Sequence, residues 1–184
     1  VIPDWKLSRV TPIYKGKGDA LNETNYRPIS VIGHIPKILE KLVKQQLMGH
    51  LIQNDLIGID QSAYRNAHNT QTSLHKVLED WLDNLNDNLL TGICLLDISK
   101  CFDTISHNIL LNKMKHYGIN NIEHEWFKSY LKDRTQVVAC HNKLSSKKVV
   151  NIGVPQGSVL GPILFLIFVN DLPFNVHLGS CNMY

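Results

Sequence analysis

The sequence lacks the features that mark several common protein classes. Its longest apolar run, Val159–Val169, is much shorter than the about 20 residues that a membrane-spanning helix needs, and no secretory signal peptide is recognisable. The four cysteines form no CxxC pair and no Cys/His pairing of the zinc type. Internal repeats and low-complexity segments are also missing. We therefore expect a reduced, intracellular protein without a membrane segment or a zinc site.

The sequence also lacks a strong charge of either sign. Its net charge of +3 permits contact with nucleic acid but does not require it. On charge alone, solvated loops explain the basic clusters better than a nucleic-acid surface does. The stretch Gly16-Lys17-Gly18 lacks the spacing and the Lys-Ser/Thr ending of a phosphate-binding loop, so it is interpreted as a turn. The clusters contain Lys6, Arg9, Lys15 and Lys17 near the start and Lys143, Lys147 and Lys148 later.

What the chain does contain is enough apolar sequence for a core. Hydrophobic residues make up 43% of 184 residues, which suits one domain or two small lobes. The order of the expected elements is strands, helices, strand, helices, hairpin, helix, which predicts an α+β (mixed α/β) fold. Periodicity and turn residues predict two strands around a Gly-, Asp- and Asn-rich loop in 10–32, helices over 36–54, 70–86, 106–118, 123–131 and 159–169, a buried strand over 91–97, and a hairpin of 135–140 with 147–152.

Two of these elements make specific predictions about burial. In 70–86, six apolar residues fall at helical spacing with acids opposite them, so we expect the apolar stripe to face the core. The run 91–97 ends in an acid, and Cys94 lies inside it, so we expect a buried strand and a buried thiol. The stripe consists of Leu74, Val77, Leu78, Trp81, Leu82 and Leu85.

The acid that ends this strand, Asp97, has two interpretations. A carboxylate there could bond to the following turn, or it could be one ligand of a magnesium ion, which takes one or two protein carboxylates. Asp103 follows six residues later, and we expect it to cap the next helix, as Ser106 also could. Phe102, between the two acids, is most simply a core residue.

The stretch "VPQGSVLGP" is the other informative one. Two prolines and two glycines around Gln156 fix a particular backbone path. Gln156 offers both a donor and an acceptor, and Gly157 lets a flat ligand approach the main chain. A bend before a buried helix would not need the glutamine.

Taken together, these motifs resemble a known family. "LLDISKCFDTISH" followed by "GVPQGSVLGPILFLIFVNDLP" is similar to motifs A and B of reverse transcriptases, in the jockey-like variety of non-LTR retrotransposons. "NYRPISV", "QSAYRNAHNTQTSL" and "WFKSYLKDRTQVV" resemble the segments around these motifs, in the expected order. The resemblance covers essentially the whole chain. It implies the fingers (1–90) and part of the palm (91–184) of a right-hand polymerase, with two-metal transfer of dNTPs onto a primer 3′-hydroxyl.

The resemblance also implies roles for single residues. Asp97 would be catalytic and would bind two Mg²⁺ ions (Mn²⁺ as a possible substitute), with help from the backbone carbonyl of Ile98. The nucleotide would be bound by Arg27, Phe102 as a steric gate against ribonucleotides, Gln156 and Gly157. The template or other nucleic acid would be bound by Arg65, Lys15 and Lys17.

The family further implies the partners and an expectation about the ends of the chain. RNA template, DNA primer and dNTPs are the implied partners, with further domains such as an endonuclease and a thumb, and the nucleus is the implied place of action. Because Tyr184 resembles the first residue of a motif C that continues Ala-Asp-Asp, we expect the 184-residue chain alone to be inactive.

Two alternatives stay open at this point. An RNA-dependent RNA polymerase also spaces two acids as Asp97 and Asp103 are spaced, although Phe102 and the "PQG" triplet oppose it. A non-catalytic, nucleic-acid-binding remnant of a transposable element is the second, although the catalytic motifs show no damage.

Overall fold

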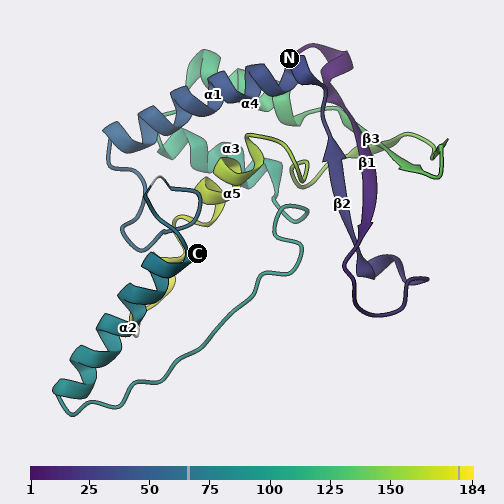
Figure 1. Ribbon diagram of the computed structural model, residues 1–184. Helices are drawn as coiled ribbons and strands as arrows, with labels where there is room; N and C mark the ends of the chain where they lie inside the picture. The colour runs from purple at the N-terminus through teal and green to yellow at the C-terminus, as the bar shows by residue number, and fades with distance from the viewer. Residues whose placement is uncertain (66, 178) are drawn as a thin grey trace.

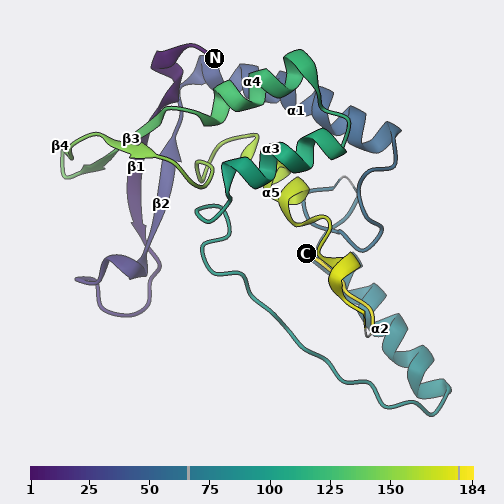
Figure 2. The ribbon, with the colours of Figure 1, turned by 180° about the vertical axis from the view of Figure 1, so that it is seen from behind.

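A mixed sheet lies beside a group of helices, and one helix projects away from both (Figures 1 and 2). The computed structural model describes residues 1–65, 67–177 and 179–184. Within them, no helix is both long and apolar enough to span a membrane. The helices are α1 (His34–Gln53), α2 (Thr70–Asn86), α3 (His107–His116), α4 (Asn121–Leu131) and α5 (Gly161–Val169), and the strands are β1 (Leu7–Tyr14), β2 (Tyr26–Val31), β3 (Arg134–Cys140), β4 (Lys143–Leu144) and β5 (Lys148–Val150).

The sheet joins the beginning of the chain to its second half. Strands follow the order β2-β1-β3-β4, and β5 also pairs with β3. β1 and β2 are antiparallel, from Arg9 opposite Val31 to Tyr14 opposite Tyr26. β1 and β3 are parallel, with Leu7 opposite Thr135. The predicted hairpin of β3 with β5 and the predicted pair β1–β2 are confirmed, whereas the parallel β1–β3 pairing was not predicted.

The core lies among α1, α3, α4 and α5. Helix α5 is apolar on all sides, as expected of a helix that neighbours enclose, and Ile163, Leu164, Leu166 and Ile167 are almost fully buried. They belong to one cluster with Leu110 and Met114 of α3 and with residues of α1 and α4. The loop before α5, which contains Gln156, is therefore attached to the most buried element of the molecule.

A buried polar network ties this loop to α1, α4 and β3. The Glu40 carboxylate, 3% exposed, accepts hydrogen bonds from the Tyr130 hydroxyl at 2.8 Å and from the Val159 amide at 2.7 Å. The Arg134 guanidinium lies over the Tyr130 ring, 4.7 Å from its centroid, and donates to the Tyr130 carbonyl. Burial raises the pKa of the Tyr130 hydroxyl, and the Glu40 charge raises it further.

The predicted buried strand over 91–97 is wrong. Residues 89–98 form no strand and are exposed throughout, including Cys94 and Asp97. A strand needs a neighbour that pairs with its backbone groups, and no strand in the described part of the chain lies beside this run. Apart from the Leu89 amide, which donates to the Asn84 carbonyl at 2.8 Å, its backbone N–H and C=O groups have no backbone partner among the described residues, and the thiol that we expected to be buried is exposed.

The prediction that the apolar stripe of α2 faces the core is also wrong. The helix spans the predicted residues, but none of them is buried. Leu74, Leu78, Leu82 and Leu85 are 43–67% exposed, because α2 extends away from the remaining helices (Figures 1 and 2). Helical spacing shows which face of a helix is apolar, but it does not show what covers that face.

Candidate active site

Two loops that are distant in sequence are joined through their backbones. The Gly153 amide donates to the Ile105 carbonyl and the Val154 amide to the Phe102 carbonyl, both at 2.8 Å. Gly153 has φ +83°, and a Cβ atom there would lie 2.8 Å from the Cα of Asp103 and from the Phe102 carbonyl oxygen. Only glycine fits this crossing. The 102–105 loop and the 153–157 loop therefore form one unit.

The same unit also lies against the edge of β2. The Ser30 amide donates to the Gln156 carbonyl at 2.7 Å. Gly157, at φ +108°, approaches so closely that a Cβ atom would lie 2.7 Å from the Ser30 carbonyl oxygen. The glycine that we singled out for close approach of a ligand thus makes a close approach to the protein's own backbone.

Asp103 and Gln156 bind each other across this junction. The Gln156 Nε2 lies 3.0 Å from Oδ1 and 2.9 Å from Oδ2 of Asp103. The expectation that Asp103 caps the next helix is therefore wrong, and the N-cap residue Ser106 makes no capping hydrogen bond with its side chain either. Sequence spacing gave no sign of this pair, because 53 residues separate its members.

Phe102 and Asp97 lie in different environments. Phe102 is half-buried and its ring centroid is 5.4 Å from that of Phe165, next to the core. Asp97 and Ile98 are exposed. Burial raises the pKa of the Cys101 thiol, and the charges of Asp103 and Asp97 raise it further. The charge of Asp97 therefore reaches the Cys101 thiol, next to the 102–105 loop.

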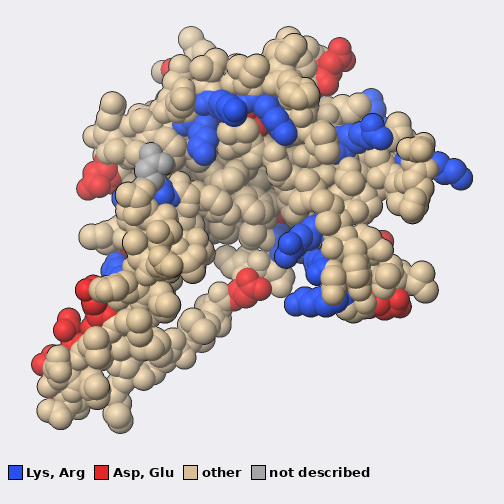
Figure 3. All heavy atoms as spheres, viewed as in Figure 1, with Lys and Arg blue, Asp and Glu red and all other residues tan. Residues whose placement is uncertain are grey.

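The predicted basic residues are spread over two regions. Arg27 is exposed on β2, and Lys15 and Lys17 lie in the loop that joins β1 to β2, where the Lys15 ammonium donates to the Thr24 carbonyl at 2.7 Å. Arg65 lies elsewhere and donates to the carbonyls of Gly58 and Gln61, both at 3.1 Å. Figure 3 shows Lys and Arg atoms over α1 and around the sheet, and Asp and Glu atoms gathered on α2.

A cavity of about 230 Å³ lies between the sheet and the 153–157 loop. Ser8, Ser30, Asp103, Arg134 and Gln156 are among its lining residues, and the Nε atom of the buried Arg134 has no hydrogen-bond partner. Of the residues predicted to bind nucleotide or metal, only Gln156 lines it. The residues predicted to bind nucleotide and metal therefore do not come together at this cavity.

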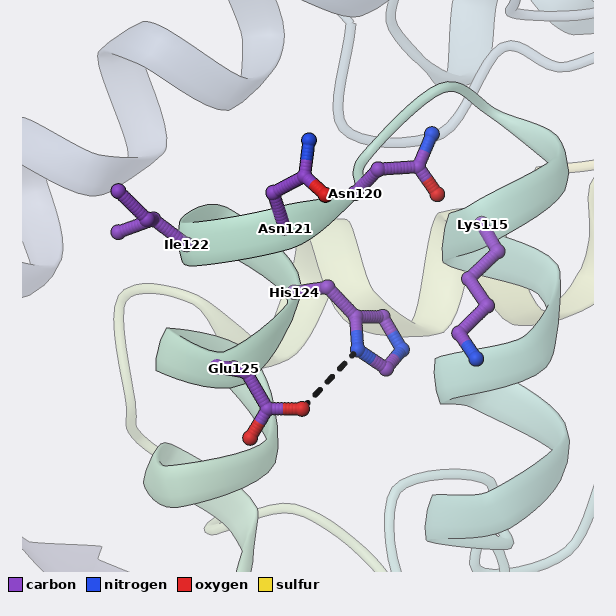
Figure 4. Close-up of a pocket in the computed structure, with 6 residues that line it drawn as sticks. All are labelled: Lys115, Asn120, Asn121, Ile122, His124 and Glu125. Atoms are coloured by element: carbon purple, nitrogen blue, oxygen red, sulfur yellow. Dashed lines mark ion pairs between the residues drawn. The ribbon is translucent and has the colours of Figure 1, made fainter.

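A second cavity, of about 890 Å³, lies at the turn between α3 and α4. Figure 4 shows its six lining residues, with His124 and Glu125 joined by an ion pair of 3.9 Å. None of the predicted site residues lines it. The cavity is therefore separate from the junction of the two loops.

The described residues do not by themselves fit a two-magnesium centre. They include no group of three or more His, Cys, Asp and Glu side chains that could hold a metal ion. One exposed carboxylate, Asp97, with the Ile98 carbonyl beside it, cannot hold two cations about 3.5–4 Å apart.

Comparison of the sequence with known proteins identifies similar proteins. The probable RNA-directed DNA polymerase from transposon BS of Drosophila melanogaster is 31% identical over 175 residues, covering 92% of this chain and 18% of the relative. The RNA-directed DNA polymerase from mobile element jockey of the same species is 32% identical over 169 residues, again 92% and 18%.

A more distant relative, a Pol polyprotein from the type-1 retrotransposable element R2 of Popillia japonica, is 25% identical over 91% of the chain. The chain thus spans about a fifth of the length of the relatives it matches. The family model of the reverse transcriptase (RNA-dependent DNA polymerase) matches residues 14–184, which include both joined loops. The chain therefore belongs to the reverse transcriptase family.

Proposed function

We propose that this chain is part of an RNA-directed DNA polymerase of a non-LTR retrotransposon. The observation that supports it most is the family match over 14–184, which includes the 102–105 and 153–157 loops that the fold joins. The reaction forms a bond between the primer 3′-oxygen and the α-phosphorus of a dNTP. The bond from that phosphorus to the pyrophosphate oxygen breaks, pyrophosphate leaves, and the hydroxyl proton passes to solvent.

We propose that the incoming nucleotide binds beside the two joined loops. Gln156 is half-buried and Gly157 exposed, so the amide and the open main chain are both within reach of a ligand. Phe102 is held in place by Phe165, which suits a rigid steric gate against a 2′-hydroxyl. Arg27 is exposed on β2, four positions before the Val31 end of that strand, and its guanidinium suits a triphosphate.

We assign the template and primer to the basic loop and its surroundings. Lys17 is exposed in the β1–β2 loop, and Lys15 needs only to release one carbonyl to reach a phosphate. Arg65 would act near the template through the guanidinium atoms that its own loop does not use. Phosphate contacts of this kind position nucleic acid without reading its sequence.

Magnesium is proposed as the cofactor, with Mn²⁺ as a possible substitute. Asp97 and the Ile98 carbonyl would supply part of the ligand set, and other carboxylates would have to join them. The relatives are several times longer than this chain. We therefore propose that it acts with further domains, such as an endonuclease and a thumb, and that it acts in the nucleus.

Primer extension tests this function. The longest polypeptide that the gene encodes is given an RNA template, an annealed DNA primer, dNTPs and Mg²⁺, and incorporation of dNTPs is expected. Asp97→Asn should abolish it, Phe102→Ala should admit ribonucleotides, and Asp133→Asn, at an exposed residue, should change nothing. Incorporation of ribonucleotides alone by the unaltered protein would overturn the proposal in favour of an RNA polymerase.

A further inference from the structure

We propose that Asp103 is a positioning residue that fixes the orientation of the Gln156 amide, so that Gln156 meets the nucleotide with its Oε1 acceptor. The proposal rests on the proposed function, since it names the group that prepares Gln156 for nucleotide binding. Its starting point is the pair of contacts from Gln156 Nε2 to both carboxylate oxygens of Asp103, at 3.0 and 2.9 Å.

The chemistry of the two groups allows only one orientation. An ionised carboxylate only accepts hydrogen bonds, whereas an amide donates from nitrogen and accepts at oxygen. Turning the Gln156 amide over would place its oxygen against the oxygens of Asp103, which repel it. A hydrogen bond to a charged acceptor is also stronger than one between neutral groups. Asp103 therefore holds Nε2 and leaves Oε1 without a partner among the described residues.

The surroundings hold both members of the pair in place. The backbone on the Asp103 side is bound to Gly153 and Val154, and the backbone of Gln156 is bound to Ser30. His107 adds a contact of 2.7 Å from its Nε2 to the Gly153 carbonyl. The two main chains are thus held together, and the contact with Asp103 fixes how the Gln156 side chain, including its amide, is oriented.

No other contact in the described part of the structure accounts for the position of the Asp103 side chain. It caps no helix, and no cation or other donor among the described residues bonds to its carboxylate. Asp103 and Asn have the same shape, and an asparagine can present either an oxygen or an NH₂ group to its neighbour. Asp103→Asn therefore removes the preference for one orientation while keeping the packing.

The test combines a spectroscopic readout with a binding readout on the 184-residue chain. The ¹⁵N side-chain amide signal of Gln156 is identified by its loss in Gln156→Glu. It is then recorded in the unaltered chain, in Asp103→Asn and in the control Asp133→Asn. Asp133 is exposed at φ +56°, a conformation that asparagine tolerates. We expect the Gln156 signal to shift in Asp103→Asn alone.

Binding of dTTP with Mg²⁺ separates positioning from a merely structural contact. Removing a negative charge near a triphosphate should by itself strengthen binding. We expect the opposite: Asp103→Asn should weaken the affinity for dTTP about two- to tenfold. The reason is that the Gln156 amide then faces the nucleotide with its oxygen in only some of the molecules. Unchanged or tighter binding, or an unchanged Gln156 signal, would overturn the proposal.

Two further outcomes are also decisive. If Asp103→Asn unfolds, the double variant Asp103→Asn/Gln156→Glu restores the contact with donor and acceptor exchanged. In that variant an oxygen of the glutamate that replaces Gln156 still faces the nucleotide as an acceptor, so recovered folding with dTTP binding supports the proposal, and recovered folding without binding overturns it. If the unaltered chain binds no dTTP but its Gln156 signal responds to Asp103→Asn, the nucleotide-binding role of Gln156 in this chain is overturned, while the orientation set by Asp103 is supported; primer extension by the longest encoded polypeptide tests the proposed function separately.

Discussion

At the scale of single residues, two glycines determine how closely the 153–157 loop can approach its neighbours. Gly153 packs under the backbone of Asp103, and Gly157 packs against the Ser30 carbonyl. Both have positive φ, where a side chain is strained even in open space. Gly16 allows backbone strain to be measured without a steric clash. It has φ +76° and nothing within 4 Å of the position of a Cβ atom.

Gly157→Ala should therefore destabilise the protein more than Gly16→Ala. The Gly16 variant carries backbone strain of about 1–2 kcal/mol. The Gly157 variant adds a clash with a backbone oxygen, which should lower the free energy of unfolding by a further about 1–3 kcal/mol. Urea unfolding of both variants measures the difference. Equal losses would show that the close contact with Ser30 does not exist.

The buried Tyr130 hydroxyl predicts a dependence of stability on alkaline pH. Its pKa is raised in the folded protein, while an unfolded tyrosine ionises near pH 10. The contribution of the protonated Tyr130 hydroxyl to the free energy of unfolding is thus fully present below about pH 10. It falls by about 1.4 kcal/mol per pH unit above it, because only the unfolded chain then releases the proton.

Replacing Tyr130 isolates this effect from other groups that titrate at high pH. In Tyr130→Phe, the free energy of unfolding should fall less steeply between pH 9.5 and about 11, although the variant starts lower because Glu40 loses a donor. Urea unfolding at a series of pH values compares the two slopes. Parallel slopes would mean that Tyr130 ionises as readily in the folded protein as in the unfolded one.

At the scale of elements, most helices and strands were predictable from the sequence, because their apolar periodicity matches the faces they bury. The failures share a physical cause. The run 91–97 and the stripe of α2 are apolar, but pairing and burial depend on a neighbour that periodicity does not specify. The same applies to the site, where the Asp103–Gln156 pair depends on how the fold brings together two residues that are distant in sequence.

The unpaired run predicts where proteases first cut the chain. Residues 89–98 are exposed and pair with no strand, whereas the apolar helix α5 is buried. Thermolysin, which cleaves beside large apolar residues, should therefore cut within 89–98 first and leave α5 intact. Mass spectrometry of the first products locates the cut. A first cut in α5, or strong protection of 89–98 from hydrogen exchange, would contradict the exposed state.

At the scale of the whole molecule, the two halves of the chain share one sheet and one core. β1 lies between β2 and β3, and the core cluster combines α1 with α3, α4 and α5. The division into fingers (1–90) and palm (91–184) stays a prediction about polymerase lobes. Whatever the lobes do, residues from both ranges stabilise each other.

A chain cut within 89–98 should therefore stay together as one particle. We expect the two products to coelute in gel filtration without denaturant and to separate in urea. Residues 1–90 produced alone should show no cooperative unfolding, because β1 then lacks β3 and α1 lacks α5. Separation of the products without denaturant, or a cooperatively unfolding 1–90 piece, would show that the ranges fold independently.

The parallel pairing of β1 with β3 also has a consequence for biosynthesis. When the ribosome has produced β1 and β2, the free edge of β1 must wait for Val138, 107 residues after Val31. At cellular rates of translation the wait lasts roughly 5 to 21 seconds. During that interval the nascent hairpin presents an open edge to any extended peptide nearby, so chaperones that cover such edges should raise the yield of native protein.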